Sequence, residues 1–289
     1  MLLVKYFLSI FYIYYLCLCS TPGYRAERFV SEVNVLKVIH CDGGVYGITH
    51  LDTELFVCTG GSERVAAYDL NTYSATRHVT VPGMKNPWSL AACKQNNCLY
   101  ISDYGLKCIH RVNLSDDTCS KWSVKAQPCG VSLTRAFNLL VTLPQSIEEY
   151  TTTGSLIRSI TLDASIDNPQ HAIELSSGQF VVCHVGNAQH RVCVVDTNGH
   201  IVHSYGGPRG SSTGQLNAPW SLAVDTRGCV FVADYWNHRV QLLSPTLTHL
   251  GDVTTPGHKL CCPCGLHLDE LNGRLYVGDT SRRLLVLSL

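Results

Sequence analysis

The sequence predicts an all-β protein, a six-bladed β-propeller closed by an N-terminal strand. Two observations lead to this prediction. A unit of β-rich runs separated by turn residues recurs six times, and its starting points lie roughly 40 to 50 residues apart, the period of a four-stranded blade. No helical periodicity separates the units. Length alone would also allow two average domains, so the repeat decides the fold class.

The six units begin near Val45 and then at Pro87, Pro128, Pro169, Pro219 and Pro263. The residue just before the end of the second strand is small in every unit: Cys58, Ser102, Thr142, Cys183, Ala233 and Gly278. A position that admits only small side chains is expected where neighbouring blades pack face to face. The cysteines at this position are therefore interpreted as small buried hydrophobic residues rather than reactive thiols.

The last unit lacks a fourth strand. It ends with Arg283 to Leu289, which supplies a third strand and leaves the outer edge of that sheet open. An open edge needs a pairing partner. Residues 29–39, an apolar run that precedes the first unit, are predicted to pair there and close the ring.

The fifth unit resembles the NHL repeat. It reads Pro219-Trp-Ser-Leu-Ala-Val-Asp225, then Val230-Phe-Val-Ala-Asp234, then Asn237-His-Arg239-Val. Units two, four and six match this pattern in part, whereas units one and three depart from it, and unit three has Leu143 where the family has Asp. Residues 28–289 are thus expected to form an NHL-type propeller similar to the NHL domain of tripartite-motif proteins. Because such propellers serve many roles, the resemblance alone does not assign one.

Residues 1–22 are a candidate signal peptide. A lysine-bearing start is followed by the apolar stretch Tyr6 to Cys19 and then by small and turn-forming residues, which is the order that secretory leaders use. The stretch is shorter than the roughly 20 residues of a membrane span. A misassigned start is the alternative. We expect a secreted or extracellular protein if the leader is genuine and a cytoplasmic one otherwise, with no membrane association beyond the leader.

The charge balance favours a protein partner over nucleic acid. Lys plus Arg and Asp plus Glu number 22 each, so the formal net charge is zero and no overall field attracts a phosphate backbone. RNA binding therefore stays an alternative that the composition does not favour.

The cysteines predict local disulfides at most. Of 15 cysteines, 13 remain without Cys17 and Cys19, and an odd number cannot be fully paired. The pairs Cys93–Cys98 and Cys183–Cys193 each flank a turn between paired strands and are candidate disulfides in an oxidising compartment. The sequon at Asn113 is a candidate glycosylation site in a secreted protein.

Three repeated carboxylates are interpreted as turn organisers rather than calcium ligands. Asp103, Asp234 and Asp279 end second strands, and each is followed four or five residues later by a cation: Lys107, Arg239 and Arg283. Each pair is expected to fix its own turn through hydrogen bonds to the backbone and an ion pair.

Two weak metal candidates are set aside. His171 and His184 are expected at one rim of blade four, where His190 or Cys193 would have to complete a zinc site. The run Cys261-Cys262-Pro263-Cys264, flanked by His258 and His267, has adjacent cysteines instead of the two-residue spacer of structural zinc sites. The sequence therefore predicts no metal site and no cofactor.

An aromatic and cationic face is the predicted binding site. Loops that enter first strands and loops between second and third strands meet on one face of a propeller. They carry Tyr46, Arg64, Trp88, Tyr104, Lys107, Trp220, Tyr235, Trp236, His238 and Arg282. Trp, Tyr and Arg dominate binding hot spots, although Trp88 and Trp220 could instead plug the junctions between blades.

These features predict a non-catalytic interaction module that binds a protein partner through this face. The resemblance to tripartite-motif proteins implies substrate recognition linked to ubiquitination. The alternatives are a secreted propeller hydrolase or lyase with a metal in its central channel, and RNA binding through the same face.

Overall fold

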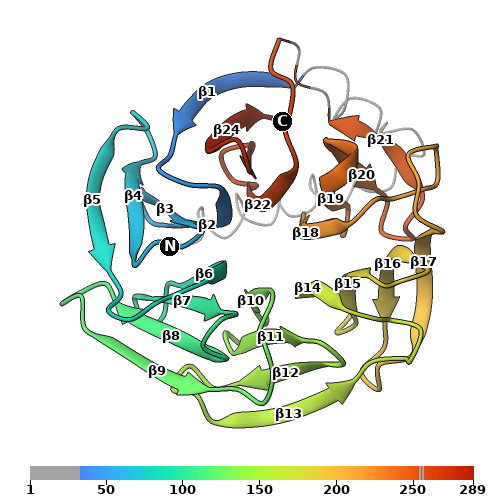
Figure 1. The fold of residues 1–289 in the computed structure, drawn as a ribbon, viewed down its shortest axis with the longest axis horizontal. Coiled ribbons are helices and arrows are strands. Elements are labelled where there is room, and N and C mark those ends of the chain that lie inside the picture. Colours follow the sequence, from blue (N-terminus) through green and yellow to red (C-terminus); the bar gives the residue numbers. More distant parts are fainter. Residues whose placement is uncertain (1–32, 254, 256) are drawn as a thin grey trace, which may run out of the picture.

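The computed structural model describes residues 33–253, 255 and 257–289, and the candidate leader at residues 1–22 lies outside them. Six antiparallel sheets of four strands each are arranged as blades around a central axis (Figure 1). The six-bladed propeller predicted from the repeat is thus confirmed. In blades one to five the strands follow one another from the axis outward in sequence order.

The blades start where the repeat predicts, with β2, β6, β14, β18 and β22 beginning at the first residue of their units. Blades one to three contain β2 (Val45–Leu51), β3 (Glu54–Thr59), β4 (Arg64–Asp69), β5 (Ala75–Thr80), β6 (Pro87–Cys93), β7 (Cys98–Asp103), β8 (Cys108–Asn113), β9 (Cys119–Ser123), β10 (Val131–Leu133), β11 (Leu139–Leu143), β12 (Ser146–Tyr150) and β13 (Leu156–Thr161). Blades four to six contain β14 (Pro169–Glu174), β15 (Phe180–Val185), β16 (His190–Val195), β17 (Ile201–Gly207), β18 (Pro219–Val224), β19 (Val230–Asp234), β20 (Arg239–Leu243), β21 (His249–Val253), β22 (Pro263–Asp269), β23 (Arg274–Asp279) and β24 (Arg283–Ser288).

The sixth blade is completed by an N-terminal strand. β1 (Asn34–His40) pairs antiparallel with β24 from Asn34 opposite Ser288 to His40 opposite Arg283, with one irregularity after Val35. The segment 29–39 was expected in this place, and its residues 29–32 lie outside the described part of the chain. Both ends of the ring therefore meet within one sheet, and β24 has no open edge.

The hydrophobic core lies between the blades rather than in one centre. The described residues form six buried clusters, and each joins two adjacent blades. The small-residue position is part of these junctions. At Gly278 an added Cβ would lie 2.4 Å from Cγ1 of Val45 in the next blade, and Ser102 donates a hydrogen bond of 2.6 Å to the carbonyl of Cys129 in the next blade. A larger side chain at this position would force neighbouring blades apart.

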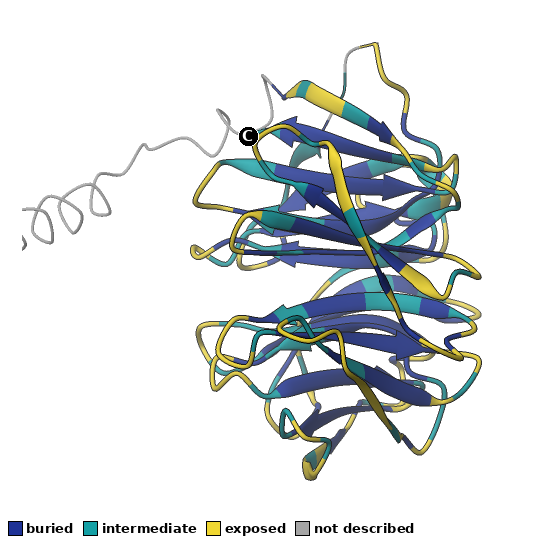
Figure 2. Ribbon diagram, turned by 90° about the vertical axis from the view of Figure 1, so that its left-hand side faces the viewer, coloured by how far each residue is buried: buried dark blue, intermediate teal, exposed yellow. Residues whose placement is uncertain are grey.

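The inner strands of the blades are largely buried, whereas the loops and the outermost strands, such as β9 and β13, are largely exposed (Figure 2). The one helix among the described residues is a single 3-10 turn, η2 (Tyr235–Asn237), between β19 and β20. None of the described segments forms a helix of the length and hydropathy that crossing a bilayer requires.

Candidate functional site

Two sets of loops gather on one face of the propeller. We call the loops that enter first strands the leading loops and those between second and third strands the middle loops. Backbone hydrogen bonds join the two sets within a blade: Gly60 N–H to Gly44 O, Tyr104 N–H to Asn86 O, Val185 N–H to Asn168 O, Tyr235 N–H to Ala218 O and Thr280 N–H to Cys261 O. The predicted loop face is therefore present, and main-chain bonds hold it in place.

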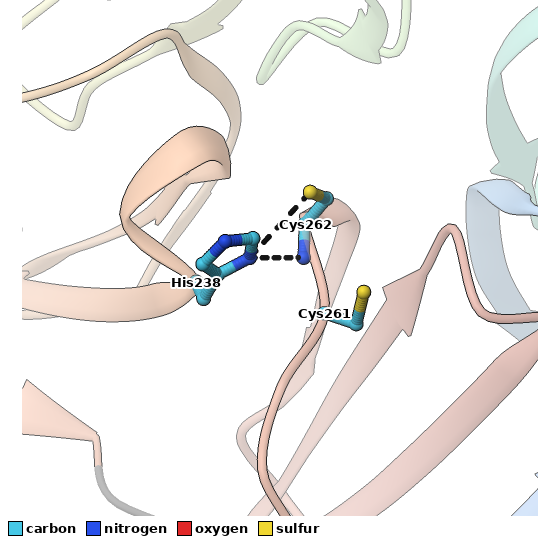
Figure 3. Close-up of side chains that lie close together, drawn as sticks. All are labelled: His238, Cys261 and Cys262. Atoms are coloured by element: carbon cyan, nitrogen blue, oxygen red, sulfur yellow. Dashed lines mark hydrogen bonds between the residues drawn. The ribbon is translucent and has the colours of Figure 1, made fainter.

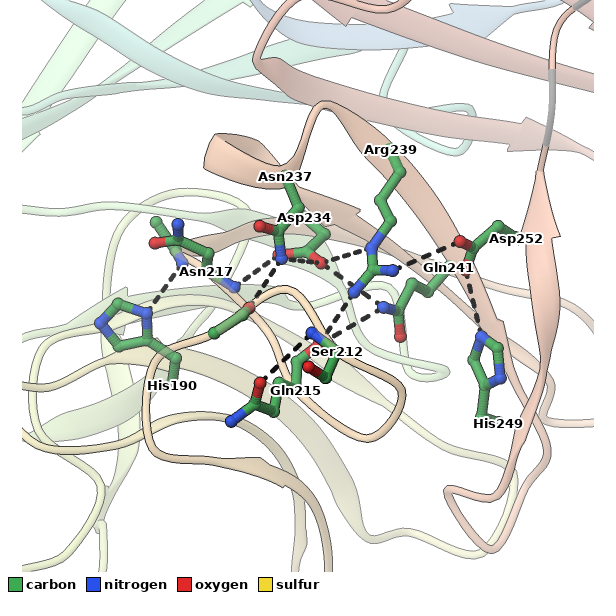
Figure 4. Close-up of polar contacts among 12 residues, drawn as sticks. His190, Ser212, Gln215, Asn217, Asp234, Asn237, Arg239, Gln241, His249 and Asp252 are labelled. Carbon is green, nitrogen blue, oxygen red and sulfur yellow. Dashed lines mark hydrogen bonds and ion pairs between the residues drawn. The ribbon is translucent and has the colours of Figure 1, made fainter.

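A buried carboxylate organises this face in blade five (Figure 4). Asp234, at the end of β19, accepts hydrogen bonds from the backbone N–H of Asn217 at 2.6 Å, from the side-chain amide of Asn237 at 2.8 Å and from Nε of Arg239 at 2.9 Å. Arg239 also donates to the carbonyl of Gln215 at 3.0 Å. One carboxylate thus fixes the leading loop, the middle loop and the third strand. Burial raises the pKa of Asp234, and its hydrogen bonds with Asn217, Asn237 and Arg239 oppose that shift.

The pair in blade six follows the same scheme. Asp279 is fully buried and accepts hydrogen bonds from Nε of Arg283 at 3.0 Å and from a second guanidinium nitrogen at 2.6 Å. The same guanidinium donates to the carbonyl of Lys259 in the leading loop at 2.7 Å. The predicted turn-organising role is confirmed in blades five and six.

In blade two the prediction that Lys107 pairs with Asp103 is wrong. Asp103 accepts three backbone N–H bonds, from Lys85 at 2.7 Å, Asn86 at 3.2 Å and Leu106 at 3.0 Å. Its side-chain partner is Nε2 of His110 at 3.3 Å. Lys107 is exposed and lies one residue before the third strand, so Cys108 and not Lys107 occupies the position of Arg239 and Arg283.

Four aromatic rings form a continuous stack across the centre of this face. Trp88 and Trp220, from blades two and five on opposite sides of the ring, lie with their ring centroids 5.1 Å apart. Tyr104 stacks on Trp88 and Tyr235 stacks on Trp220, each at 4.9 Å. We call these four residues the aromatic stack. The two tryptophans thus meet each other across the ring.

Two further aromatic residues extend the aromatic stack. Tyr46 stacks on Trp88 at 5.8 Å, and Trp236 meets Tyr235 edge to face at 4.9 Å. Trp236 is 55% exposed and Tyr104 is 37% exposed. The indole N–H groups of Trp88 and Trp220 are buried and have no hydrogen-bond partner within the described residues. The structure thus brings all six predicted aromatic residues into one set of ring contacts.

The predicted cationic residues surround this set without joining it. Arg64, Lys107 and Arg282 are exposed on their middle loops or at the start of a third strand. Within the described part of the chain, the one cation–π contact is that of Arg158 in β13 over Phe180 in β15, and it involves none of these residues. His238 is exposed, and its Nδ1 accepts the backbone N–H of Cys262 at 3.0 Å.

A cavity of about 250 Å³ occupies the channel further along the first strands than the aromatic stack. Every blade contributes lining residues: Ile48, Thr49, Leu90, Ala91, Ala92, Val131, Ser132, Leu133, His171, Ile173, Leu222, Ala223, Val224, Leu266, His267 and Leu268. Nε2 of His267 lies 2.6 Å from Nδ1 of His50. Burial, with a smaller contribution from His50, lowers the pKa of His267 to about 3, so this ring is neutral at physiological pH.

His171 and His184 do not form a common metal site. Nδ1 of His171 accepts the backbone N–H of Leu222 in blade five at 3.1 Å. His184 instead accepts a hydrogen bond from Nε of Arg191 at 3.2 Å and lies against the carbonyl of Asp167. Burial lowers the pKa of each imidazole to about 4. The two side chains have separate partners, and Nε2 of His171 has no hydrogen-bond partner among the described residues.

The strand register excludes one of the two candidate disulfides and allows the other. Cys183 lies opposite Val192 and Cys193 lies opposite Val182, so the two side chains project from opposite faces of the sheet into different clusters. That candidate is wrong because the register is offset by one residue. Cys93 and Cys98 lie directly opposite each other and share one cluster. All thirteen described cysteines are free thiols, so Cys93–Cys98 stays a prediction.

The sequon residue Asn113 ends β8 at a surface turn, where its side-chain oxygen accepts the backbone N–H of Ser115 at 3.0 Å. Glycosylation there stays a prediction.

The cysteine run before β22 has an unexpected histidine partner. The sequence placed His258 and His267 beside it, whereas the structure brings His238 from blade five to Cys261 and Cys262. His267 forms a hydrogen bond with His50, and Cys264 donates its thiol hydrogen to the carbonyl of Val45 at 3.1 Å. Sequence reasoning missed this contact because it joins loops of two different blades.

The comparisons agree with the fold. Residues 216–241, which contain Asp234 and Arg239, match the NHL repeat. No curated protein shows significant sequence similarity to the chain. Its structure is similar to the hydrazine synthase of Kuenenia stuttgartiensis, with TM-score 0.64 and 14% identity over 87% of this chain and 97% of that chain.

Two other similar structures are a lyase and a WD40 propeller domain. Virginiamycin B lyase from Staphylococcus aureus has TM-score 0.63 and 12% identity over 89% of this chain and 100% of that chain. The WD40 β-propeller domain of Doa1 has TM-score 0.65 and 13% identity over 89% of this chain and 97% of that chain. At identities this low, the structural similarity establishes a shared fold and does not establish a shared activity. The chain is accordingly a six-bladed β-propeller that carries an NHL repeat in its fifth blade.

Proposed function

We propose that the protein is a non-catalytic interaction module that binds a protein partner through the face formed by its leading and middle loops. The observation that carries this proposal is the row of ring contacts ending in exposed Trp236 and Tyr104. Large aromatic side chains contribute much of the binding energy at protein interfaces.

The position of Trp236 supports a binding role because its backbone is already fixed. Its N–H donates to the carbonyl of Asn217 at 3.0 Å, and the neighbouring Asn237 is held by Asp234. A rigid loop loses little conformational entropy when a partner docks on it. An exposed indole on such a loop is therefore a favourable contact point.

The residues of the channel favour binding over channel chemistry. Among the described residues that line the cavity, none is a carboxylate, and His171 and His267 each use one ring nitrogen in a hydrogen bond, with Leu222 and with His50. A metal-dependent hydrolase or lyase in the channel would need several oxygen or imidazole ligands converging there. The loop face, in contrast, carries the exposed aromatic and cationic side chains.

The test compares two exposed aromatic residues on different loops. Trp236→Ala removes an indole from the loop face, and Phe137→Ala removes a 42% exposed phenyl from the loop between β10 and β11, which joins a first to a second strand. Proteins captured from an extract by the parent protein, by Phe137→Ala and by Trp236→Ala are quantified side by side. We expect Phe137→Ala to retain a specific set of proteins that Trp236→Ala loses by about thirtyfold, the equivalent of roughly 2 kcal/mol.

Equal capture by all three proteins would contradict the proposal. Thermal unfolding of the two variants must match the parent closely, since both side chains are exposed and contribute little to the core. Treatment of the captured material with ribonuclease separates the RNA alternative. Loss of binding after that treatment would assign RNA as the partner and overturn a protein partner.

The specific form of this function is recognition of a substrate for ubiquitination, which follows from the resemblance to tripartite-motif NHL domains. It requires the protein to be intracellular. The mature N-terminus, measured by mass spectrometry of the expressed protein, decides this point. Removal of residues 1–22 would support secretion and exclude the ubiquitin-linked form, while leaving partner binding by the loop face intact.

A further inference from the structure

Three potential ligand atoms from two blades lie together beside the aromatic stack. They belong to His238 in the middle loop of blade five and to Cys261 and Cys262 in the leading loop of blade six (Figure 3). One ligand atom from each residue lies within 4.8 Å of the other two. The cluster lies on the surface, because His238 is exposed and Cys261 is partly exposed, whereas Cys262 is buried.

The backbone explains how adjacent cysteines reach one site. Cys262 has a φ of 50° and His238 has a φ of 54°, both in the left-handed region that residues other than glycine adopt rarely. In an extended strand, neighbouring side chains would point to opposite sides. The left-handed turn at Cys262 removes that alternation, which is why the missing spacer does not exclude a shared site.

Hydrogen bonds hold these residues in place. The carbonyl of Cys261 accepts bonds from the backbone N–H and the hydroxyl of Thr280, both at 3.2 Å. The backbone N–H of Cys262 donates to Nδ1 of His238 at 3.0 Å, so this nitrogen carries an electron pair rather than a proton. The imidazole therefore presents a lone pair toward the cysteines.

The spacing of nitrogen and sulfur fits one metal ion. Zinc binds imidazole nitrogen at about 2.0 Å and thiolate sulfur at about 2.3 Å in tetrahedral geometry, which places two such ligands about 3.5 Å apart. The distance between Nδ1 of His238 and Sγ of Cys262 is 3.5 Å. Two thiolates and one imidazole are also the ligand types that zinc prefers.

We propose that His238, Cys261 and Cys262 bind one Zn²⁺ ion and leave its fourth position open to solvent. This inference goes beyond the proposed partner binding and does not depend on it. Each thiol loses its proton on binding, and Nδ1 exchanges its hydrogen bond with Cys262 N–H for the metal. The ion would join the loops of blades five and six next to Tyr235, and its open position would accept a donor group from outside the chain.

The experiment uses the whole protein under reducing conditions. Zn²⁺ is titrated against a chromophoric chelator, and Co²⁺ is used as a spectroscopic substitute whose charge-transfer absorption reports bound thiolates. We expect one ion per chain, a cobalt spectrum with thiolate charge transfer, and a rise in melting temperature with zinc. Cys261→Ser, Cys262→Ser and His238→Ala should each weaken zinc binding at least a hundredfold.

The matched control is Cys264→Ser, which changes the nearest cysteine outside the cluster and keeps a donor for the carbonyl of Val45. It should bind zinc as the parent does. If Cys262→Ser does not fold, the cobalt spectrum of the parent and the exposed His238→Ala variant still decide the matter. The proposal is overturned if the parent binds no zinc, if bound cobalt lacks thiolate charge transfer, or if the site accepts Cu⁺ but not Zn²⁺.

Discussion

Blades two and five lie opposite each other in the ring and carry the same aromatic residues on the loop face. Trp88 and Tyr104 in blade two occupy the positions of Trp220 and Tyr235 in blade five. In both of these blades the second strand also ends with a fully buried aspartate, Asp103 or Asp234. Viewed from the aromatic stack, the two halves of the face are nearly equivalent.

The partners of the buried aspartates differ. In blade five Asp234 meets the guanidinium of Arg239, whereas in blade two Asp103 meets the imidazole of His110 and three backbone N–H groups. Cys108 occupies the position of Arg239 at the start of the third strand. In these two blades a buried carboxylate gathers backbone N–H donors, while its side-chain partner differs. The NHL match covers the first two strands of blade five and the start of the third, where the arginine lies.

The largest expected effect separates these two partners. Arg239→Met leaves the Asp234 carboxylate buried without its cation and should lower the free energy of unfolding by about 3 kcal/mol or more. His110→Leu leaves Asp103 with its three backbone N–H bonds and should cost about 1 kcal/mol. Denaturant unfolding of both variants measures the difference. Equal losses would mean that the arginine charge is not what stabilises blade five.

The pH dependence of stability should sharpen the same comparison. Burial lowers the pKa of His110, although Asp103 acts in the opposite direction, and burial lowers the pKa of His171 and of His184 to about 4. The unfolded chain binds protons on these histidines below about pH 6.5, whereas the folded rings take them up only at lower pH. The free energy of unfolding should therefore fall as the pH decreases from about 6.5 toward 4.

A variant that copies blade five isolates the contribution of blade two. Gln241 stands in blade five where His110 stands in blade two. His110→Gln should reduce the loss of stability between about pH 6.5 and pH 4 without removing it, since His171 and His184 still titrate. Urea unfolding of parent and variant across this range provides the measurement. Parallel curves would show that His110 does not contribute.

The smallest expected effect concerns the two tyrosines. Tyr104→Leu and Tyr235→Leu each remove one stacked ring contact, and such contacts contribute about 0.5 to 1.5 kcal/mol beyond area burial. Tyr235 also contacts Trp236, so its replacement should cost slightly more. Thermal and denaturant unfolding compare the variants. A loss several times larger for one tyrosine would contradict the near equivalence of the two halves.

The sequence predicts most of the fold because the repeat sets the period and the small-residue position sets the blade junctions. Val45 and Pro263 begin strands where the repeat places them. The sequence does not predict side-chain partners that depend on strand register or on the geometry of the ring. The offset between Cys183 and Cys193 is a single residue, and the contact between Trp88 and Trp220 depends on the width of the ring.

The same limit explains the histidine partners. Lys107 lies one residue before the third strand, which begins at Cys108, so Asp103 pairs with His110 instead. His238 reaches Cys262 because adjacent blades bring their loops together. A local sequence pattern contains neither the handedness of a turn nor the neighbour of a loop. The residue types of the face were predictable, whereas their pairings were not.

The pairing of β1 with β24 also sets the order in which the protein matures on the ribosome. β1 is synthesised before any blade, and its partner strand is synthesised after β23. Until β24 is synthesised, β1 therefore has no strand to pair with, and the ring of blades is not closed. An unpaired strand edge is a site for chaperone capture or for pairing with another nascent chain. The interval between synthesis of β1 and synthesis of β24 is therefore the time during which these edges stay exposed.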